Sequence, residues 1–309
     1  SISDGRFDFG TQPSWVKNRE SINTTIAQRP AWVQIGHQVN VNVNNRWNQA
    51  FTRPGANWWR PPANRLSYWR GWGDGVRHGW RHYPNCHHWF AGSWWANHYH
   101  PLSPWHYHFR WGLYPPAYWW RVTTWPVLTP WFFGPPAPPP VWQQPVYYDY
   151  GAGGNVTYEN NYVFVDGQPI ATADEFAQTA AALATVTPPA SDAEAEAAEW
   201  LPLGTFAVAT SKSDIDPSRT VQLAVSKTGI ISGTLYNVDT DSAQSLQGQV
   251  DKETQRVAIR IGENEGIVIE TGLYNLTQDE VPLLVHFGTD RRENWLLVRL
   301  TNADDEQAQ

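Results

Sequence analysis

Four histidines stand in two short triplets that a proline-containing loop separates. His98 and His100 flank one tyrosine, His106 and His108 flank another, and residues 101–105 lie between the triplets. If both triplets are extended, each pair of imidazoles points to one side. Four imidazoles on one face suit zinc, copper or nickel. We favour the alternative that the rings stack and hydrogen-bond among neighbouring Trp and Tyr side chains, because no carboxylate or second cysteine is near to complete a site.

The single cysteine, Cys86, excludes an intramolecular disulfide. A buried thiol and an intermolecular bridge are both open. The pair Cys86-His87 is also half of a haem c attachment motif, but Tyr83 occupies the position of the second cysteine. The sequence therefore predicts no cofactor, with a transition metal at the four histidines as the alternative.

These residues belong to an aromatic segment, residues 46–142, which holds 16 of the 20 Trp, eight of the 10 His and one acidic residue. It has few aliphatic residues, and its many prolines and glycines predict short helices and irregular pieces. Such rings form either a self-contained aromatic core or a surface that binds another chain, another copy or a sugar. We predict the second, with an interface made of Trp58, Trp59, Trp69, Trp72, Trp94, Trp95, Trp119 and Trp120.

Charge divides the chain in two. Residues 1–150 carry 13 Arg and Lys against 5 Asp and Glu, whereas residues 151–309 carry 9 against 24. A basic aromatic half joined to an acidic half predicts docking within or between chains, so a homo-oligomer or other surface proteins are the expected partners. Nucleic acid is not expected, because the second half is strongly acidic.

The ends and the hydropathy of the chain bear on its location. The sequence begins at Ser1 and contains no Met, which we interpret as the result of a removed signal peptide. No apolar run approaches the ~18–20 residues of a membrane span. We therefore expect an extracellular or cell-surface protein without a transmembrane segment.

Periodicity gives a coarse map of the first 80 residues. Spacing predicts a helix over residues 14–28, and the alternation of Val and Asn over residues 39–43 predicts a short strand. Trp69, Trp72, Val76 and Trp80 recur at helical spacing.

The middle of the chain carries clearer local signals. Residues 156–165 alternate around a turn at residues 159–161, which predicts a hairpin. Thr172 and Glu175 predict a capping box for a helix that ends near residue 184. Ser191 and Glu194 cap a second, acidic helix over residues 192–199.

The last hundred residues alternate strand after strand, which predicts a mainly β fold, with a small antiparallel meander of about eight strands that forms a barrel or a sandwich. The predicted strands are residues 203–210, 220–226, 230–238, 245–251, 255–262, 266–276, 282–288 and 294–300. The residues predicted to point inward are Phe206, Val208, Leu223, Val225, Ile231, Leu235, Val257, Ile259, Ile267, Ile269, Leu284 and Val298. A barrel of this size fills itself or holds one ligand. Four charged or titratable residues lie within the strands, and they form either a polar cluster or, as we favour, part of a solvated outer face or a docking surface: Arg260, Glu270, His286 and Arg299.

The resulting division is an arm (1–45), the aromatic segment (46–142), a hairpin with a short helix (143–187), an acidic linker helix (188–201), the β-domain (202–301) and an acidic tail (302–309). Over residues 143–300 the chain resembles a family of secreted planctomycete proteins described as mu-protocadherin-like or putative cell-surface proteins. The segments that carry this resemblance are residues 146–151, 155–158, 249–258, 270–277, 284–288 and 295–300. The aromatic segment is similar to the corresponding part of those proteins in being rich in Trp and His. The resemblance implies export and a surface role, and it implies no catalytic residue.

No nucleophile elbow, Gly-rich phosphate loop or pair of inward carboxylates is present, so we do not expect an enzyme. The leading hypothesis is a structural protein of the cell surface that assembles into oligomers or filaments, or docks on a scaffold, through its aromatic segment. The alternative is a binding module, either for a glycan on the Trp-rich face or for a small ligand inside the barrel. A metal or haem carrier is a third hypothesis.

Overall fold

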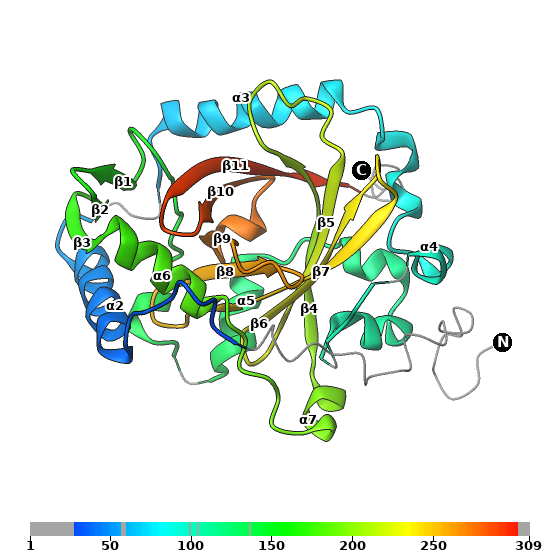
Figure 1. Ribbon diagram of the computed structural model, residues 1–309, viewed down its shortest axis with the longest axis horizontal. Helices are drawn as coiled ribbons and strands as arrows, with labels where there is room; N and C mark the ends of the chain where they lie inside the picture. Colours follow the sequence, from blue (N-terminus) through cyan, green and yellow to red (C-terminus); the bar gives the residue numbers. More distant parts are fainter. Residues whose placement is uncertain (1–27, 57–59, 99, 104, 136, 302–309) are drawn as a thin grey trace.

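The computed structural model describes residues 28–56, 60–98, 100–103, 105–135 and 137–301. An eight-stranded antiparallel barrel forms its centre, and the N-terminal half of the chain lies around the outside of that barrel (Figure 1). The predicted mainly β fold is confirmed, and the closed strand order decides for a barrel rather than a sandwich.

The barrel strands follow one another in chain order. Each pairs with the next, and the last pairs with the first, so none of these eight strands has an unpaired edge. The strands are β4 (Trp200–Ala209), β5 (Arg219–Ser226), β6 (Ile230–Asn237), β7 (Ser242–Val250), β8 (Arg256–Ile261), β9 (Ile267–Gly272), β10 (Glu280–Phe287) and β11 (Arg291–Leu300).

One predicted strand, residues 266–276, is too long. β9 ends at Gly272, and a short 3₁₀ helix, η7 (Asn275–Thr277), follows it. The Asn275 side chain bonds both backbone groups of Tyr148, accepting from its N–H at 2.9 Å and donating to its carbonyl at 2.8 Å. The chain therefore leaves the strand to place this amide where it anchors residues of the N-terminal half.

The predicted inward residues, except Leu284 and Val298, belong to the cluster inside the barrel. Leu284 and Val298 point outward, and their neighbours Leu283 and Leu297 point inward. Both faces of β10 and β11 are covered, so apolar residues occur consecutively and period-two alternation does not reveal the inward phase.

The N-terminal half contributes short helices joined by irregular chain. They are α2 (His37–Thr52), α3 (Ala63–Gly79), η3 (Tyr83–His88), α4 (Gly92–Asn97), η4 (Tyr107–Leu113), η5 (Pro116–Trp120), α5 (Trp125–Phe133) and η6 (Pro140–Trp142). The predicted helix through Trp69 and Val76 is confirmed as α3. The helix predicted over residues 14–28 lies almost wholly outside the described residues, and only residue 28 is described.

The strand predicted over residues 39–43 is wrong, because these residues form the first turns of α2. Val43, Trp47, Ala50 and Phe51 are buried on one face of that helix. Their spacing of four, three and one residues is helical, and it decides the structure over the short Val-Asn alternation.

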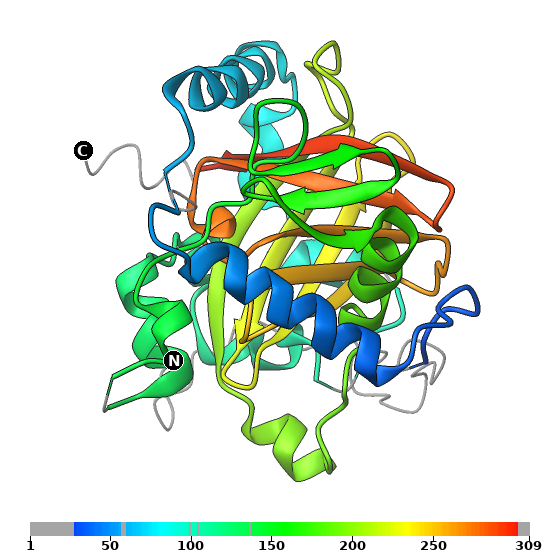
Figure 2. The ribbon, with the colours of Figure 1, turned by 90° about the vertical axis from the view of Figure 1, so that its left-hand side faces the viewer.

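A small sheet and two helices connect the two halves. β1 (Val156–Glu159), β2 (Tyr162–Val165) and β3 (Gln168–Thr172) form a three-stranded sheet, followed by α6 (Ala173–Leu183) and α7 (Asp192–Ala197). The capping box of Thr172 and Glu175 and the cap at Ser191 are confirmed. Figure 2 shows α2, α6 and the small sheet on one side of the barrel. No helix in the described ranges is long and apolar enough to cross a membrane.

Candidate functional site

The tryptophans predicted to form an interface are buried inside the chain. Trp69, Trp72, Trp94, Trp95, Trp119 and Trp120 expose 5% of their surface or less, and Trp58 and Trp59 lie outside the described residues. The prediction of an exposed contact surface at these six side chains is therefore wrong. The physical reason is that the aromatic segment packs on the outer faces of β4, β5 and β11, where small residues such as Ala207, Ala209 and Ala224 leave room for rings.

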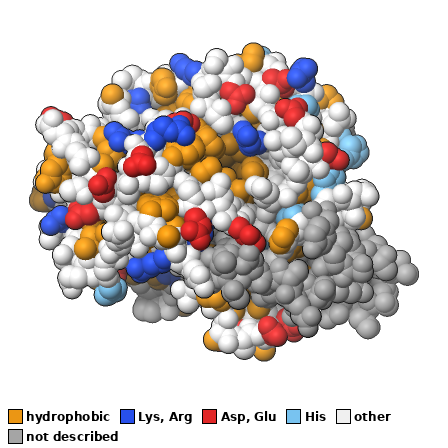
Figure 3. Space-filling model, viewed as in Figure 1, with side chains coloured by type: hydrophobic (Ala, Val, Ile, Leu, Met, Phe, Trp, Pro, Cys, Tyr) orange, Lys and Arg blue, Asp and Glu red, His pale blue; other side chains and the backbone are white. Residues whose placement is uncertain are grey.

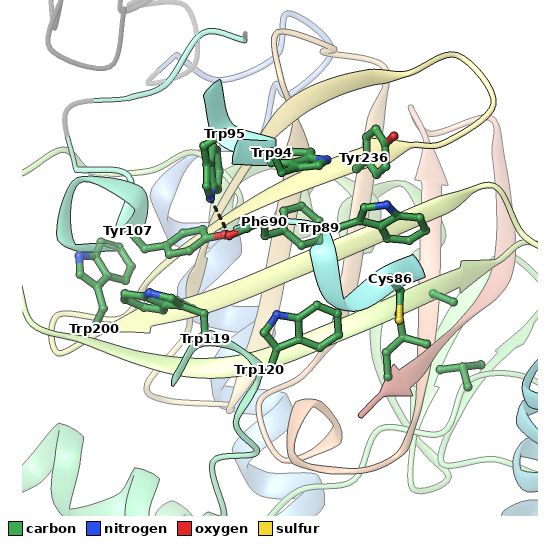
Figure 4. Packing of buried hydrophobic residues seen from close by; sticks show 14 of the residues in the cluster. Cys86, Trp89, Phe90, Trp94, Trp95, Tyr107, Trp119, Trp120, Trp200 and Tyr236 are labelled. Atoms are coloured by element: carbon green, nitrogen blue, oxygen red, sulfur yellow. Dashed lines mark hydrogen bonds between the residues drawn. The ribbon is translucent and has the colours of Figure 1, made fainter. Parts of the chain in front are cut away.

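The rings of this aromatic layer interlock around Trp95. Its indole N–H donates to the carbonyl of Phe90 at 2.9 Å, and its ring lies edge to face with Trp94 at 5.0 Å between centroids. His108 stacks on the same indole at 3.9 Å. Figure 4 shows Trp94 and Trp95 with Trp119, Trp120 and Tyr236 beside the barrel strands. Such geometry is that of a packed core.

The four histidines of the two triplets are part of this layer. His98 lies between the carbonyl of Trp94, at 2.7 Å, and the carboxylate of Asp241, at 2.8 Å. His106 binds the carbonyl of Gly233 at 2.9 Å. Among the described residues, no three His, Cys, Asp or Glu side chains are grouped to hold a metal ion. The stacking that we favoured from the sequence is present, and the absence of a cofactor stays a prediction.

Burial keeps several of these imidazoles neutral. It lowers the pKa of His100 to about 4 and that of His106 to about 3, and it holds the pKa of His108 well below its ordinary value. Cys86 is similar in kind, because burial raises the pKa of its thiol to about 11 and the sulfur donates to the carbonyl of Tyr83. These groups are poor nucleophiles and poor acid–base catalysts at neutral pH.

A buried ionic cluster lies on another outer face, between the barrel and α6. Arg256 donates to Glu270 at 2.9 Å, and His286 contacts the same carboxylate oxygen at 3.0 Å. The guanidinium of Arg256 lies 4.5 Å from the rings of both Trp47 and Phe176. Burial alone would raise the pKa of Glu270, but Arg256 and His286 outweigh burial and hold it below its usual value.

The sequence expectation of a solvated face is therefore wrong for Glu270 and His286, which helix α6 covers. Arg260 is buried as well, and its guanidinium donates to the carbonyl of Gln28 at 2.7 Å. These residues hold the N-terminal half against the barrel. Docking does occur on this face, but it occurs within one chain.

The barrel interior contains a cavity of about 380 Å³. Its deep part is aliphatic, with Leu223, Leu246, Ile259, Leu283 and Leu297 all buried. Protein interiors normally leave few voids larger than a water molecule. An apolar space of this size inside the central barrel is therefore the strongest candidate for a binding site.

One end of the barrel is closed. Arg299, which is inward near the end of β11, donates to the carbonyls of Leu203 at 2.8 Å and Leu276 at 2.7 Å, and its guanidinium lies 4.5 Å from the ring of Phe206. Burial lowers the pKa of Arg299 to about 10. Gly204 has a φ of 112° and makes room for this guanidinium, because a β-carbon there would lie 2.2 Å from Nη1. Arg299 is thus neither solvated nor part of the cluster around Glu270.

The opposite end of the barrel is open. Arg219, Gln244 and Asn264 line the cavity from the ends and loops of strands that meet there, and each is exposed. Phe287 and Trp295 also line it and are partly exposed although they belong to the interior cluster. Viewed as in Figure 1, hydrophobic side chains gather near the centre of this face, with Lys and Arg beside them (Figure 3). A small molecule therefore has an entrance.

A second depression, of about 670 Å³, lies outside the barrel. It is bounded by Trp105, Trp200 and the prolines 188 and 189, together with Glu194, Glu199 and Lys227. It is larger than the barrel cavity, but Glu194, Glu199 and Lys227 stand in its walls, whereas the barrel cavity has one charged lining residue among those described, Arg219 at its entrance. We therefore place the candidate site in the barrel.

Sequence reasoning named many inward residues but missed the polar residues of the entrance. Arg219 stands two residues before Val221 on the same strand, so period-two alternation places it on the inward face. The same argument places Gln244 beside Leu246. The alternation places both residues inward, but the predicted strands begin at residues 220 and 245 and so exclude them.

No family model, curated protein or solved structure matches this chain. The candidate site therefore rests on its own geometry.

Proposed function

We propose that this protein binds a small, mainly apolar molecule inside its barrel. The observation that carries the proposal is the aliphatic cavity of about 380 Å³, closed at Arg299 and open beside Arg219. An eight-stranded barrel is wide enough to hold one small ligand, and cavities of roughly 300–1,000 Å³ are typical of ligand sites. Burial of apolar ligand surface supplies the affinity at about 25 cal/mol per Å².

The lining supports binding rather than chemistry. Among the described residues that line the cavity, the polar side chains are Arg219, Gln244, Asn264 and Thr271. Thr271 donates its hydroxyl to the carbonyl of Pro282 at 2.9 Å. The set offers no carboxylate, imidazole or thiol to act as nucleophile or general base. We therefore propose a carrier or binding module and not an enzyme.

Assembly on a cell surface stays as a second proposal with weaker support. The opposite charges of the two halves favour docking, but Arg77 with Glu280 and Arg81 with Asp216 already pair the two halves within one chain. Closure of the barrel also leaves none of its eight strands with an unpaired edge for lateral pairing between copies. Export to the cell surface is compatible with either function. Light scattering of the purified protein tests assembly, and a monomer would leave binding as the sole proposal.

The test of binding is an equilibrium titration with 1-decanol, a neutral apolar probe, followed by isothermal calorimetry. We expect saturable binding to the parent protein with one site per chain. Leu246→Trp places an indole into the cavity and should weaken binding at least tenfold. Leu113→Trp is the matched control, because Leu113 is 47% exposed on η4, outside the barrel. No saturable binding by the parent, or equal binding by Leu246→Trp while circular dichroism shows native structure, contradicts the proposal.

A further inference from the structure

Apart from Thr271, whose hydroxyl donates to the carbonyl of Pro282, the charged and polar side chains of the cavity are confined to its entrance. The register places Val221, Leu235 and Gln244 at one level of the barrel, with Leu223 and Leu246 one step deeper. Arg219 stands one inward position closer to the open end than Val221. The cavity therefore changes from aliphatic to polar along its axis.

Arg219 is the one charged side chain among the described residues that line the cavity. No salt bridge or hydrogen bond joins its guanidinium to another described residue. A guanidinium offers five N–H donors in a planar fork that matches a carboxylate. An anionic group at the entrance would thus find a partner that is otherwise solvated.

No Asp or Glu is among the described residues that line the cavity, although Asp239, Glu263, Glu265 and Asp290 stand in the loops at this end. Two further acidic residues at the same end, Glu293 and Asp241, are engaged elsewhere. Glu293 pairs with Arg291, and it accepts the indole N–H of Trp295 at 2.8 Å. Asp241 binds His98 and Tyr236 on the outside of the barrel. Their negative charges are therefore partly balanced, and they do not line the cavity.

The size of the cavity limits the apolar part of the ligand. At roughly 30 Å³ for each water-sized group, 380 Å³ holds about a dozen non-hydrogen atoms. A single unbranched chain fits a narrow barrel closed at one end better than a fused ring system does, because it enters through one opening and fills the axis.

We propose that the ligand is a medium-chain carboxylate, held with its hydrocarbon tail inside the barrel and its carboxylate against Arg219. This inference rests on the proposed function, since it assigns the chemistry and orientation of the ligand in the same cavity. Leu223, Leu246 and Ile259 surround the tail. Gln244 and Asn264 offer further amide donors at the entrance.

The experiment compares three probes of equal chain length, decanoate, 1-decanol and decylamine, by calorimetry at pH 7.5. Decanoate should bind about five- to tenfold more tightly than 1-decanol, since an ion pair at an exposed entrance contributes modestly. Decylamine should bind more weakly than either. Shortening the carboxylate from ten carbons to eight and six should weaken binding about fourfold per methylene.

Variants at the entrance assign the effect to one side chain. Arg219→Gln should weaken decanoate about five- to tenfold and leave 1-decanol within twofold of the parent, and Arg219→Lys should restore part of the loss. Lys212→Gln is the matched control, because Lys212 lies on the neighbouring β4–β5 loop with its ammonium 4.6 Å from the ring of Tyr68 and does not line the cavity. This control should bind decanoate as the parent does.

The outcomes separate the two proposals. If 1-decanol and decanoate both fail to bind, the proposed function itself is wrong. If both bind but with equal affinity, or if Arg219→Gln weakens them equally, the cavity is a binding site and the carboxylate assignment is wrong. Tighter binding of decylamine than of decanoate also overturns the assignment, since it would place the acidic residues of the loops in control of the entrance.

Discussion

The same barrel strands carry aromatic rings on part of their outer face and aliphatic side chains on their inner face. Outside, Trp95 touches other rings on several sides and its N–H has a backbone partner. Inside, Leu246 and Ile259 border a cavity of about 380 Å³. The aromatic residues therefore pack against the outside of the barrel, and the interior holds the cavity in which we propose that a ligand binds.

Polar groups are buried in two different ways on the outer face of the barrel. In the aromatic layer, His100 and His106 are buried as neutral rings with backbone carbonyls as partners. Beneath α6, Arg256 and Glu270 are buried as an ion pair. Lowering the pH should therefore reduce the stabilising contribution of each region over a different pH range, which denaturation at several pH values measures.

The largest effect should follow removal of a ring from the aromatic layer. Trp95→Ala deletes a buried indole and should lower the free energy of unfolding by about 3–5 kcal/mol, because the surrounding rings cannot all collapse into the space. Urea denaturation measures it. Val127→Ala, at a side chain that is 49% exposed, is the control and should stay within about 0.5 kcal/mol of the parent. A loss below about 1 kcal/mol for Trp95→Ala would show that the layer does not stabilise the barrel.

Glu270→Gln should lower the free energy of unfolding by about 3 kcal/mol at neutral pH, because it leaves the guanidinium of Arg256 buried without its anion. The pKa of Glu270 is lowered in the folded state. Its contribution is therefore complete above the unfolded pKa of about 4.3 and is lost as the pH falls through the folded pKa. The difference in free energy of unfolding between parent and variant, measured by urea denaturation, should narrow below about pH 4. Glu159→Gln, at an exposed position on β1, controls for loss of a carboxylate, and a gap that is constant from pH 7 to pH 3 would contradict the prediction.

His106→Gln tests the other kind of burial. The folded pKa of His106 is about 3, far below the unfolded value of about 6.5, so the unfolded chain takes up the proton first. The stability that His106 contributes is complete above about pH 6.5 and falls as the pH drops from there towards the folded pKa. When the pH is lowered from 7.5 to 5, the free energy of unfolding of the parent should fall by about 2 kcal/mol more than that of His106→Gln. Equal losses in denaturation series at the two pH values would mean that this imidazole is not buried.

The smallest effect concerns the interior. At ten times its dissociation constant, 1-decanol should stabilise the folded parent by about 1.4 kcal/mol, because it binds the folded barrel alone. Leu246→Trp should show no such increase, and Leu113→Trp should match the parent. Thermal unfolding with and without the probe measures the difference. An equal increase in all three proteins would place the probe outside the barrel.

Much of the fold can be predicted from the sequence, because local signals agree with the global structure. Alternation, turn residues and the capping box of Thr172 mark the strands and α6 within a few residues. The phase of β10 and β11 cannot be read, because Leu284 and Val298 are buried against the outer layers and hydrophobicity does not distinguish the two faces. The helix at residues 39–43 is missed because five residues of alternation are too short a window.

The site is harder to predict than the fold. The abundance of Trp predicts a contact surface, but abundance does not say whether a ring meets another chain or the same one, and here Ala207 and Ala224 on the barrel provide the complementary surface. Inward alternation finds the cavity walls. It does not reveal that they leave space between them, since that depends on the diameter of the closed barrel and on Arg299 at its end.

One measurement tests the central claim most directly. Crystals of the parent protein grown with 10-bromodecanoate give an anomalous signal that locates the bromine atom without any assumption about the site. We expect one bromine position per chain deep in the barrel, near Leu223, Leu246 and Ile259, with the carboxylate at Arg219. A bromine in the depression beside Trp105 and Trp200, or among the rings around Trp95, with none inside the barrel, would contradict it.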